Sequence, residues 1–277
     1  MCIRDSLMEG AKSVLLFVVD GLRPDGLEKA ETPCIDSLVN NGAYTFKART
    51  VMPSITLPCL ASMFLGTEPK HHGITTNTWN AAAQSIPSII DVIHLEGMTA
   101  SSFYNWEPLR DLSKPGSLSA SFFLDNCEEP QGDLEIARLA ADYLSQKPVS
   151  FAFIYLGHTD AAGHKYGWMT DGYFEAVENA DAAISEVLKS IDKAGTAENT
   201  VFIVTSDHGG HGRIHGTEVL EDLIVPWIIS GSKIPSGLEL NVPINIIDTA
   251  PTIAAILGID PPKQWTGRVI SQVFKKF

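Results

Sequence analysis

Acidic and imidazole side chains gather in one short stretch of the chain, residues 200–216. The stretch opens with an apolar run, 201–204, which is typical of a strand buried on both faces of a parallel sheet. One aspartate and three histidines follow it directly, spaced by glycines: Asp207, His208, His211 and His215. A single loop histidine is usually only solvated, but four possible ligands in one tight loop indicate a metal site. Carboxylate with imidazole is a ligand set that suits zinc.

Two more predicted strands end in possible metal ligands. Asp20 follows an apolar run over 13–19, and Asp160 and His164 follow another over 149–155. Alone, Asp20 would be taken for a turn residue. The carboxyl ends of parallel strands meet at one edge of a sheet, where open α/β folds bind their ligands. We therefore expect these side chains to converge with those of the first stretch.

Thr56 lies near the start of a predicted helix that runs from Pro58 to Leu65 and stops at Gly66. Free backbone N–H groups and the helix dipole at such a terminus favour an anion. They would also favour the alkoxide of a threonine that acts as a nucleophile. Threonine is equally common as an N-cap, so this segment alone leaves both roles open.

The elements that must position these residues alternate between buried strands and amphipathic helices. This order predicts an α/β fold, a three-layer sandwich with a mostly parallel central sheet flanked by helices. No linker or internal repeat interrupts residues 7–277, which we expect to form a single domain. Residues 104–133 are the least regular stretch, either a lid or substrate loop or a surface excursion. Further strands are expected over 44–50, 99–103 and 225–230, and helices over 87–95, 134–145, 171–193 and 246–257.

The composition excludes several classes of protein. Hydrophobic residues make up 44% of the 277 positions and charged residues 19%, which argues against disorder. No apolar run approaches the roughly 18–20 residues of a membrane helix. A net charge of −13 without a basic cluster argues against nucleic-acid polymers as partners. A small anionic substrate stays compatible with this charge, because bound cations reverse the local field.

The first six residues, MCIRDS, read like a translated sequencing adapter, and we expect them not to belong to the natural protein. Without Cys2, three cysteines are left: Cys34, Cys59 and Cys127. They are far apart and form no CxxC pair, so neither a disulfide framework nor a cysteine zinc site is expected. Buried thiols favour a reducing compartment.

Six motifs of the chain occur in the order seen in the alkaline phosphatase superfamily. They are VVDGLRPD, TP with Leu38 five residues after its proline, MPSITLPCL, HHGITTN, DAAGH and SDHGG followed by HG. The sequence most closely resembles the type I phosphodiesterase/nucleotide pyrophosphatase branch, over roughly residues 14–231. Each motif is weak to moderate alone, and their ordered combination carries the resemblance.

The resemblance implies a phosphoester hydrolase with two divalent cations, expected to be zinc, that acts on a small phosphorylated substrate. Thr56 would attack phosphorus to give a phosphothreonine, and Asn77 would bind a phosphoryl oxygen. Two cations about 3.5–4 Å apart can stabilise both the attacking and the leaving oxygen. The implied ligands are Asp20, Asp207, His208 and the Thr56 hydroxyl for one cation, and Asp160, His164 and His215 for the other.

The remaining histidines have less specific expectations. His211 is an alternative to His215, which is preferred because Gly216 and an acidic stretch follow it, as in the family. His158 either touches substrate or lines its loop. Structural roles are expected for the other three, His71, His72 and His94.

The residue at the nucleophile position distinguishes several other activities of this scaffold from the one expected here. A sulfatase matures a cysteine or serine in a CxPxR-type sequence, whereas this chain has Thr56-Leu57-Pro58-Cys59-Leu60. Cofactor-independent phosphoglycerate mutases use serine and carry a large inserted domain. Phosphonoacetate hydrolases and phosphoethanolamine transferases also use threonine and stay open as alternatives. A non-catalytic ligand-binding relative would have lost the nucleophile or a ligand, and every implied position is present.

Overall fold

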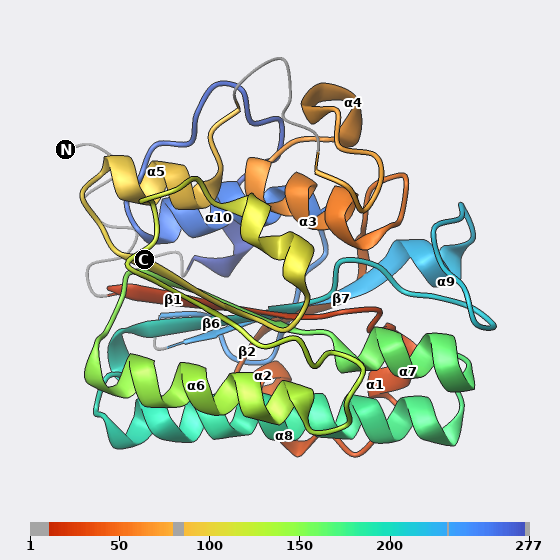
Figure 1. The fold of residues 1–277 in the computed structure, drawn as a ribbon. Helices are drawn as coiled ribbons and strands as arrows, with labels where there is room; N and C mark the ends of the chain where they lie inside the picture. Colours follow the sequence, from red (N-terminus) through yellow and green to blue (C-terminus); the bar gives the residue numbers. More distant parts are fainter. Residues whose placement is uncertain (1–10, 80–85, 232, 275–277) are drawn as a thin grey trace.

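A computed structural model of the chain describes residues 11–79, 86–231 and 233–274. These residues form the predicted α/β fold, with a mixed, mostly parallel sheet between two layers of helices (Figure 1). The eight described strands are ordered β4-β3-β5-β1-β6-β7-β2-β8. Residues 1–6, the expected adapter, lie outside the described part. The strands are β1 (Ser13–Val19), β2 (Gly42–Arg49), β3 (Ala100–Tyr104), β4 (Ala120–Phe123), β5 (Phe151–Leu156), β6 (Thr200–Thr205), β7 (Ile224–Gly231) and β8 (Leu238–Glu239).

The centre of the sheet consists of β1 with β5 and β6 on either side, all parallel. Apart from half-buried Ser13, their residues are buried, and most are Val, Leu, Ile or Phe, as expected of strands covered on both faces. Because β5, β1 and β6 are parallel neighbours, their carboxyl ends lie side by side at one edge of the sheet. β7 is antiparallel to both β6 and β2.

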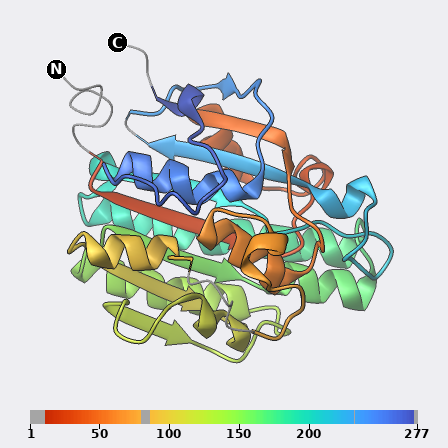
Figure 2. The ribbon, with the colours of Figure 1, turned by 90° about the horizontal axis from the view of Figure 1, so that it is seen from above.

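Helices cover both faces of the sheet, and each layer encloses its own apolar core (Figures 1 and 2). One layer contains α3 (Thr56–Leu65), α5 (Ile89–Leu95) and α10 (Thr249–Ile256). The other contains α2 (Pro33–Asn40), α6 (Gly132–Gln146) and α8 (Asp171–Lys193). The shorter helices are α1 (Pro24–Leu27), α4 (Pro69–His72), α7 (His158–Tyr166) and α9 (Leu220–Leu223), with 3-10 turns η2 (Glu107–Leu112), η3 (Ala197–Asn199), η4 (Ile246–Asp248) and η5 (Ser271–Val273).

Several elements differ from the expectation at their ends. Helix α3 begins at Thr56, two residues before Pro58, because a proline in the first helical turn sacrifices no helical hydrogen bond. Residues 158–166 form a helix although they contain little apolar periodicity. The irregular segment 104–133 includes η2 and β4, a short edge strand paired in parallel with β3. Its role as a lid or substrate loop stays a prediction.

No helix in the described parts of the chain is both long and apolar enough to span a bilayer.

Candidate active site

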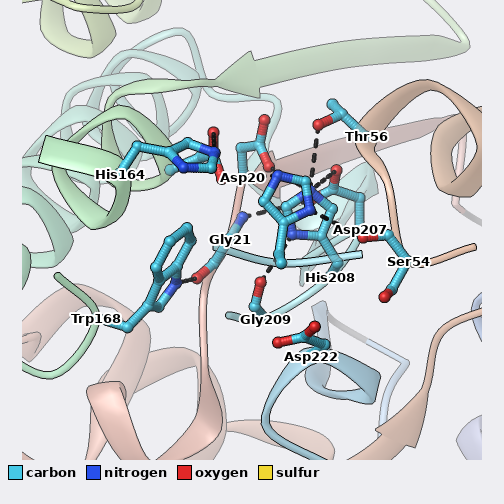
Figure 3. Close-up of polar contacts among 12 residues, drawn as sticks. Asp20, Gly21, Ser54, Thr56, His164, Trp168, Asp207, His208, Gly209 and Asp222 are labelled. Carbon is cyan, nitrogen blue, oxygen red and sulfur yellow. Dashed lines mark hydrogen bonds and ion pairs between the residues drawn. The ribbon is translucent and has the colours of Figure 1, made fainter. Parts of the chain in front are cut away.

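Three neighbouring strands deliver the predicted ligands to one edge of the sheet. Asp20 directly follows β1, and Asp207 and His208 follow β6 after one intervening residue. The chain after β5 enters α7, which carries Asp160 and His164 one helical turn apart. Because these strands are adjacent and parallel, the structure brings the five side chains together, as the sequence predicts. Figure 3 labels Asp20, His164, Asp207 and His208 among them.

The inner part of the cluster is almost completely buried. His208 Nε2 lies 3.2 Å from Asp20 Oδ1 and 3.4 Å from Asp207 Oδ2. The hydroxyl of Thr56 points at the same nitrogen, with Oγ1 3.1 Å away (Figure 3). The side chains of Asp20, Asp207 and His208 are at most 4% exposed. These four groups face one small space.

The outer part of the cluster opens towards solvent. Asp160 Oδ2 lies 3.4 Å from His164 Nε2, and its Oδ1 lies 3.7 Å from His215 Nε2. The side chain of His164 is 45% exposed. Ligand atoms of Asp160, His164 and His215 all lie within 4.8 Å of one another, and so do those of Asp20, Asp160 and His208. Asp160 therefore joins the inner and outer parts, and the rings of His208 and His215 stack with centroids 3.8 Å apart.

All three histidines of the cluster are held in the same tautomer by backbone carbonyls. Nδ1 lies 2.8 Å from Gly209 O in His208, 2.9 Å from Arg213 O in His164 and 2.9 Å from Ser54 O in His215. A carbonyl only accepts, so each Nδ1 carries a hydrogen and each ring directs its Nε2 at the carboxylates. Nε2 of an unprotonated ring and a carboxylate oxygen both present lone pairs, which a divalent cation between them would accept.

Each of the three carboxylates has one oxygen to which the described residues give no hydrogen bond. Asp20 Oδ1, Asp160 Oδ1 and Asp207 Oδ2 are buried without a hydrogen-bond partner among the described residues. Burial raises the pKa of Asp207 to about 7. Burial and then the charges of Asp207 and Asp160 raise the pKa of Asp20 well above its usual value. Burial also lowers the pKa of His215 to about 4, which keeps that ring neutral. Crowded carboxylates together with imidazoles are a donor set that fits divalent cations such as zinc.

Two residues of the site were missed by the sequence reasoning. The Tyr155 hydroxyl, at the end of β5, donates a hydrogen bond to Asp20 Oδ2. The indole of Trp168 donates to Gly21 O at 2.9 Å and packs edge-on against His164. A tyrosine inside an apolar strand gives no sequence signal of a role in the site. For Trp168 the glycines of DAAGH and SDHGG are such a signal, because they leave room for a bulky side chain: a Cβ at Gly163 would lie 2.6 Å from the Trp168 ring, and one at Gly210 would lie 2.2 Å from it.

Thr56 and Asn77 line a cavity of about 540 Å³ that the cluster also borders. Asn77 Oδ1 accepts a hydrogen bond from the backbone N–H of Leu57 at 3.0 Å. A backbone N–H bonds only to the amide oxygen, so the donors of Asn77 Nδ2 are directed elsewhere. Thr56 and Asn77 are thus connected through the first turn of α3. Trp106, Glu128, His158 and Lys165 also line the cavity.

The other histidines lie outside the cluster. His211 Nδ1 pairs with Asp222 Oδ1 at 2.7 Å, whereas His215 joins Asp160 and His164. His158 Nδ1 faces Cys127 O at 3.2 Å. His72 is buried against Ser62, and His94 is exposed on α5. Cys34, Cys59 and Cys127 are free thiols.

Comparison with known proteins gives matches across most of the chain. The bis(5'-adenosyl)-triphosphatase ENPP4 of Bos taurus is 25% identical over 96% of this chain and 59% of its own length. The chain thus spans about three fifths of that relative, and 24% of the rat ectonucleotide pyrophosphatase/phosphodiesterase family member 3. Sulfatases also occur among the matching sequences and structures.

Similar solved structures share this fold at low sequence identity. Alkaline phosphatase PafA superposes with a TM-score of 0.83 at 12% identity, covering 97% of this chain and all of that chain. An inactive threonine-to-alanine variant of murine ectonucleotide pyrophosphatase/phosphodiesterase 5, in complex with AMP, superposes with a TM-score of 0.78 at 14% identity, covering 95% and 100%. The sequence signature described as type I phosphodiesterase/nucleotide pyrophosphatase matches residues 14–228. The chain therefore belongs to the type I phosphodiesterase/nucleotide pyrophosphatase family, within the alkaline phosphatase superfamily.

Proposed function

We propose that the protein is a two-cation hydrolase of phosphodiester or pyrophosphate bonds that works through a phosphothreonine at Thr56. One observation carries the proposal: three histidines direct Nε2 at three carboxylates, beside the Thr56 hydroxyl, and buried oxygens of these carboxylates have no hydrogen-bond partner among the described residues. Asp20, Asp207 and His208 would hold one cation. Asp160, His164 and His215 would hold the other, with the Asp160 carboxylate between them.

The residues of the chain supply a nucleophile and its surroundings. Thr56 Oγ1 attacks the phosphorus atom, a bond forms between them, and the bond from phosphorus to the leaving oxygen breaks. The hydroxyl proton passes to solvent, and the departing alcohol or phosphate takes one up. Water then attacks the phosphothreonine, and its P–O bond to Thr56 breaks, which restores the hydroxyl. Bound cations would stabilise the negative charge on the attacking and leaving oxygens.

Asn77 and the start of α3 bind the phosphoryl group in this proposal. The Asn77 carbonyl is occupied by Leu57 N–H, so its amide N–H groups are the part that can donate to a phosphoryl oxygen. The N-terminus of the ten-residue helix α3, all of which is buried, adds a favourable dipole for an anion. The cavity beside Thr56 is large enough for a leaving group bulkier than phosphate. The AMP complex of the murine relative makes a nucleotide a sensible first substrate to test.

Sulfate ester hydrolysis is the second candidate, because sulfatases occur among the similar proteins. It is disfavoured at the nucleophile position, since threonine cannot be matured to formylglycine. The nearby thiol of Cys59 is fully buried against Thr50 and Pro53. The substrate panel therefore includes an aryl sulfate.

The proposal is tested by replacing Thr56. Thr56→Ala should lower kcat/KM for a bis-aryl phosphate diester by about 10³-fold or more, because the nucleophile is lost. Thr56→Ser keeps a hydroxyl and should retain measurable turnover. Mass spectrometry of acid-quenched wild-type protein should find a phosphate on the peptide that contains Thr56.

Ser62→Ala is the matched control, because it removes a hydroxyl from the same helix six residues away and should keep activity. A chelator should abolish turnover, and zinc should restore it. Full activity in Thr56→Ala, or turnover indifferent to chelator, would exclude this mechanism. An aryl monoester, phosphonoacetate and the aryl sulfate, assayed in parallel, separate the other activities of this scaffold.

A further inference from the structure

Helix α7 carries Asp160 and His164 but has no cap of its own. Its N-cap residue is Gly157, which offers no side chain to the free N–H groups of the first turn. A buried helix start needs partners for these groups from elsewhere. The partners come from two residues that are distant in sequence and lie outside the cluster.

Asn105 and Asp133 supply those partners. Asn105 Oδ1 accepts from Gly157 N at 3.1 Å, and Asp133 Oδ1 accepts from His158 N at 3.2 Å. The two side chains are also bonded to each other, because Asn105 Nδ2 donates to Asp133 Oδ1 at 2.9 Å. Both residues are 0% exposed. We call Asn105 and Asp133 the α7 clamp.

The clamp connects three elements at the edge of the sheet. Asn105 directly follows β3, and Asp133 is the second residue of α6, which lies on the same face of the sheet as α7 (Figure 1). A negative carboxylate at the start of α7 also complements the helix dipole. The space around Gly157 is tight, since a Cβ there would lie 2.9 Å from the Cys127 side chain and 3.0 Å from Asn105 Oδ1. Both ends of segment 104–133 are thus fixed on the first turn of α7.

We propose that the α7 clamp sets the position of α7 and thereby the affinity of the outer cation, the one assigned to Asp160, His164 and His215. The inference rests on the proposed function, because that function assigns a cation there. Asn105 and Asp133 are positioning residues, since they act through the backbone of α7 and not on the cation. Outer-shell partners of metal ligands typically change metal affinity by about 10–100-fold when they are removed.

The chain offers a matched control for a buried capping aspartate. Asp181 of α8 accepts from Cys34 N at 3.2 Å and Ile35 N at 2.7 Å, and it caps α2 in the same way. Its side chain is buried as well, and α2 carries none of the proposed ligands. Asp181→Ala should destabilise the protein without changing the bound zinc.

The test measures zinc directly, by elemental analysis of protein equilibrated at graded free zinc in a chelator buffer. Asn105→Ala and Asp133→Ala should each weaken one of the two zinc sites by about 10–100-fold and the other by less, because only Asp160 of α7 faces both. Asp133→Asn should stay close to wild type, because its carbonyl oxygen can accept both hydrogen bonds. Should Asp133→Ala fail to fold, Asn105→Ala and Asp133→Asn still decide the question.

A second measurement, of amide hydrogen exchange, tests the clamp in protein without bound zinc. Amide hydrogen exchange of zinc-free protein should be faster at residues 157–161 in the two alanine variants and unchanged there in Asp181→Ala. Wild-type zinc binding in both alanine variants would overturn the proposal, and so would an equal loss in Asp181→Ala. If wild-type protein bound no zinc, the proposed function would fail; unchanged exchange at 157–161 would then refute the clamp separately.

Discussion

At the scale of single residues, the arrangement around Asp20 explains how a carboxylate in a closed space can serve a cation. Its Oδ2 is occupied by the Tyr155 hydroxyl, so Oδ1 is the oxygen directed at the cluster. Burial and the neighbouring charge of Asp20 raise the pKa of Tyr155 well above its usual value. The phenol therefore stays protonated and remains a donor.

Tyr155→Phe removes only this hydroxyl. Asp20 would lose a fixed orientation, and we expect a 10–100-fold loss of affinity for the cation at Asp20, Asp207 and His208, roughly the usual cost of an outer-shell change. Zinc titration of the purified variant measures it. Tyr104→Phe is the control, because the bond that its hydroxyl makes among the described residues is a long one, accepted from Ser121 at 3.4 Å. Unchanged zinc affinity in Tyr155→Phe would show that the hydroxyl is dispensable.

At the scale of elements, α3 and α4 are joined by a buried neutral histidine. His72 Nδ1 accepts from Ile74 N at 3.1 Å, so its Nε2 carries the hydrogen and faces Ser62 Oγ at 2.8 Å. Ser62 in turn donates to Pro58 O at 2.7 Å. Burial lowers the pKa of His72 from 6.5 to about 4. Protonation of Nδ1 would place a second hydrogen against the N–H group of Ile74, which agrees with the lowered pKa of His72.

The lowered pKa predicts how stability depends on pH. The unfolded chain binds a proton at His72 below about pH 6.5, and the folded chain binds it only below about pH 4. Stability from this residue is thus fully present above pH 6.5 and is lost as the pH falls to about 4, by at most about 1.4 kcal/mol per pH unit. Urea unfolding of zinc-free wild type and His72→Gln across this range measures it.

The stability difference between wild type and His72→Gln should shrink as the pH falls. His94→Gln alters an exposed histidine on α5 and should keep the wild-type profile. If the stability difference between wild type and His72→Gln stayed constant from pH 7 to pH 4, the lowered pKa of His72 would be contradicted.

At the scale of the whole molecule, the sequence predicts the layers and the edge at which ligands meet, because buried strands and polar strand ends are local patterns. Helix α8, expected over 171–193, has those bounds in the structure. Ligands that are neighbours in the sequence, such as Asp207 and His208, can be predicted from these local patterns. The α7 clamp cannot be predicted from them, because Asn105 and Asp133 come together only in the folded chain. Helix α7 was missed because its stabilising contacts are tertiary.

One loop contributes to both proposed cation positions. Asp207 and His208 stand at its start and His215 near its end, while Arg213 between them is exposed. The peptide bond after Arg213 is therefore a natural target for trypsin, and a single cut there would separate His215 from the other proposed ligands. We expect saturating zinc to slow this cleavage, followed by mass spectrometry, and to leave cleavage after exposed Lys193 unchanged. Equal rates with and without zinc would contradict this expectation. A protease that cuts this one bond would therefore detach His215 from the outer position and free the end of the loop that carries Asp207 and His208.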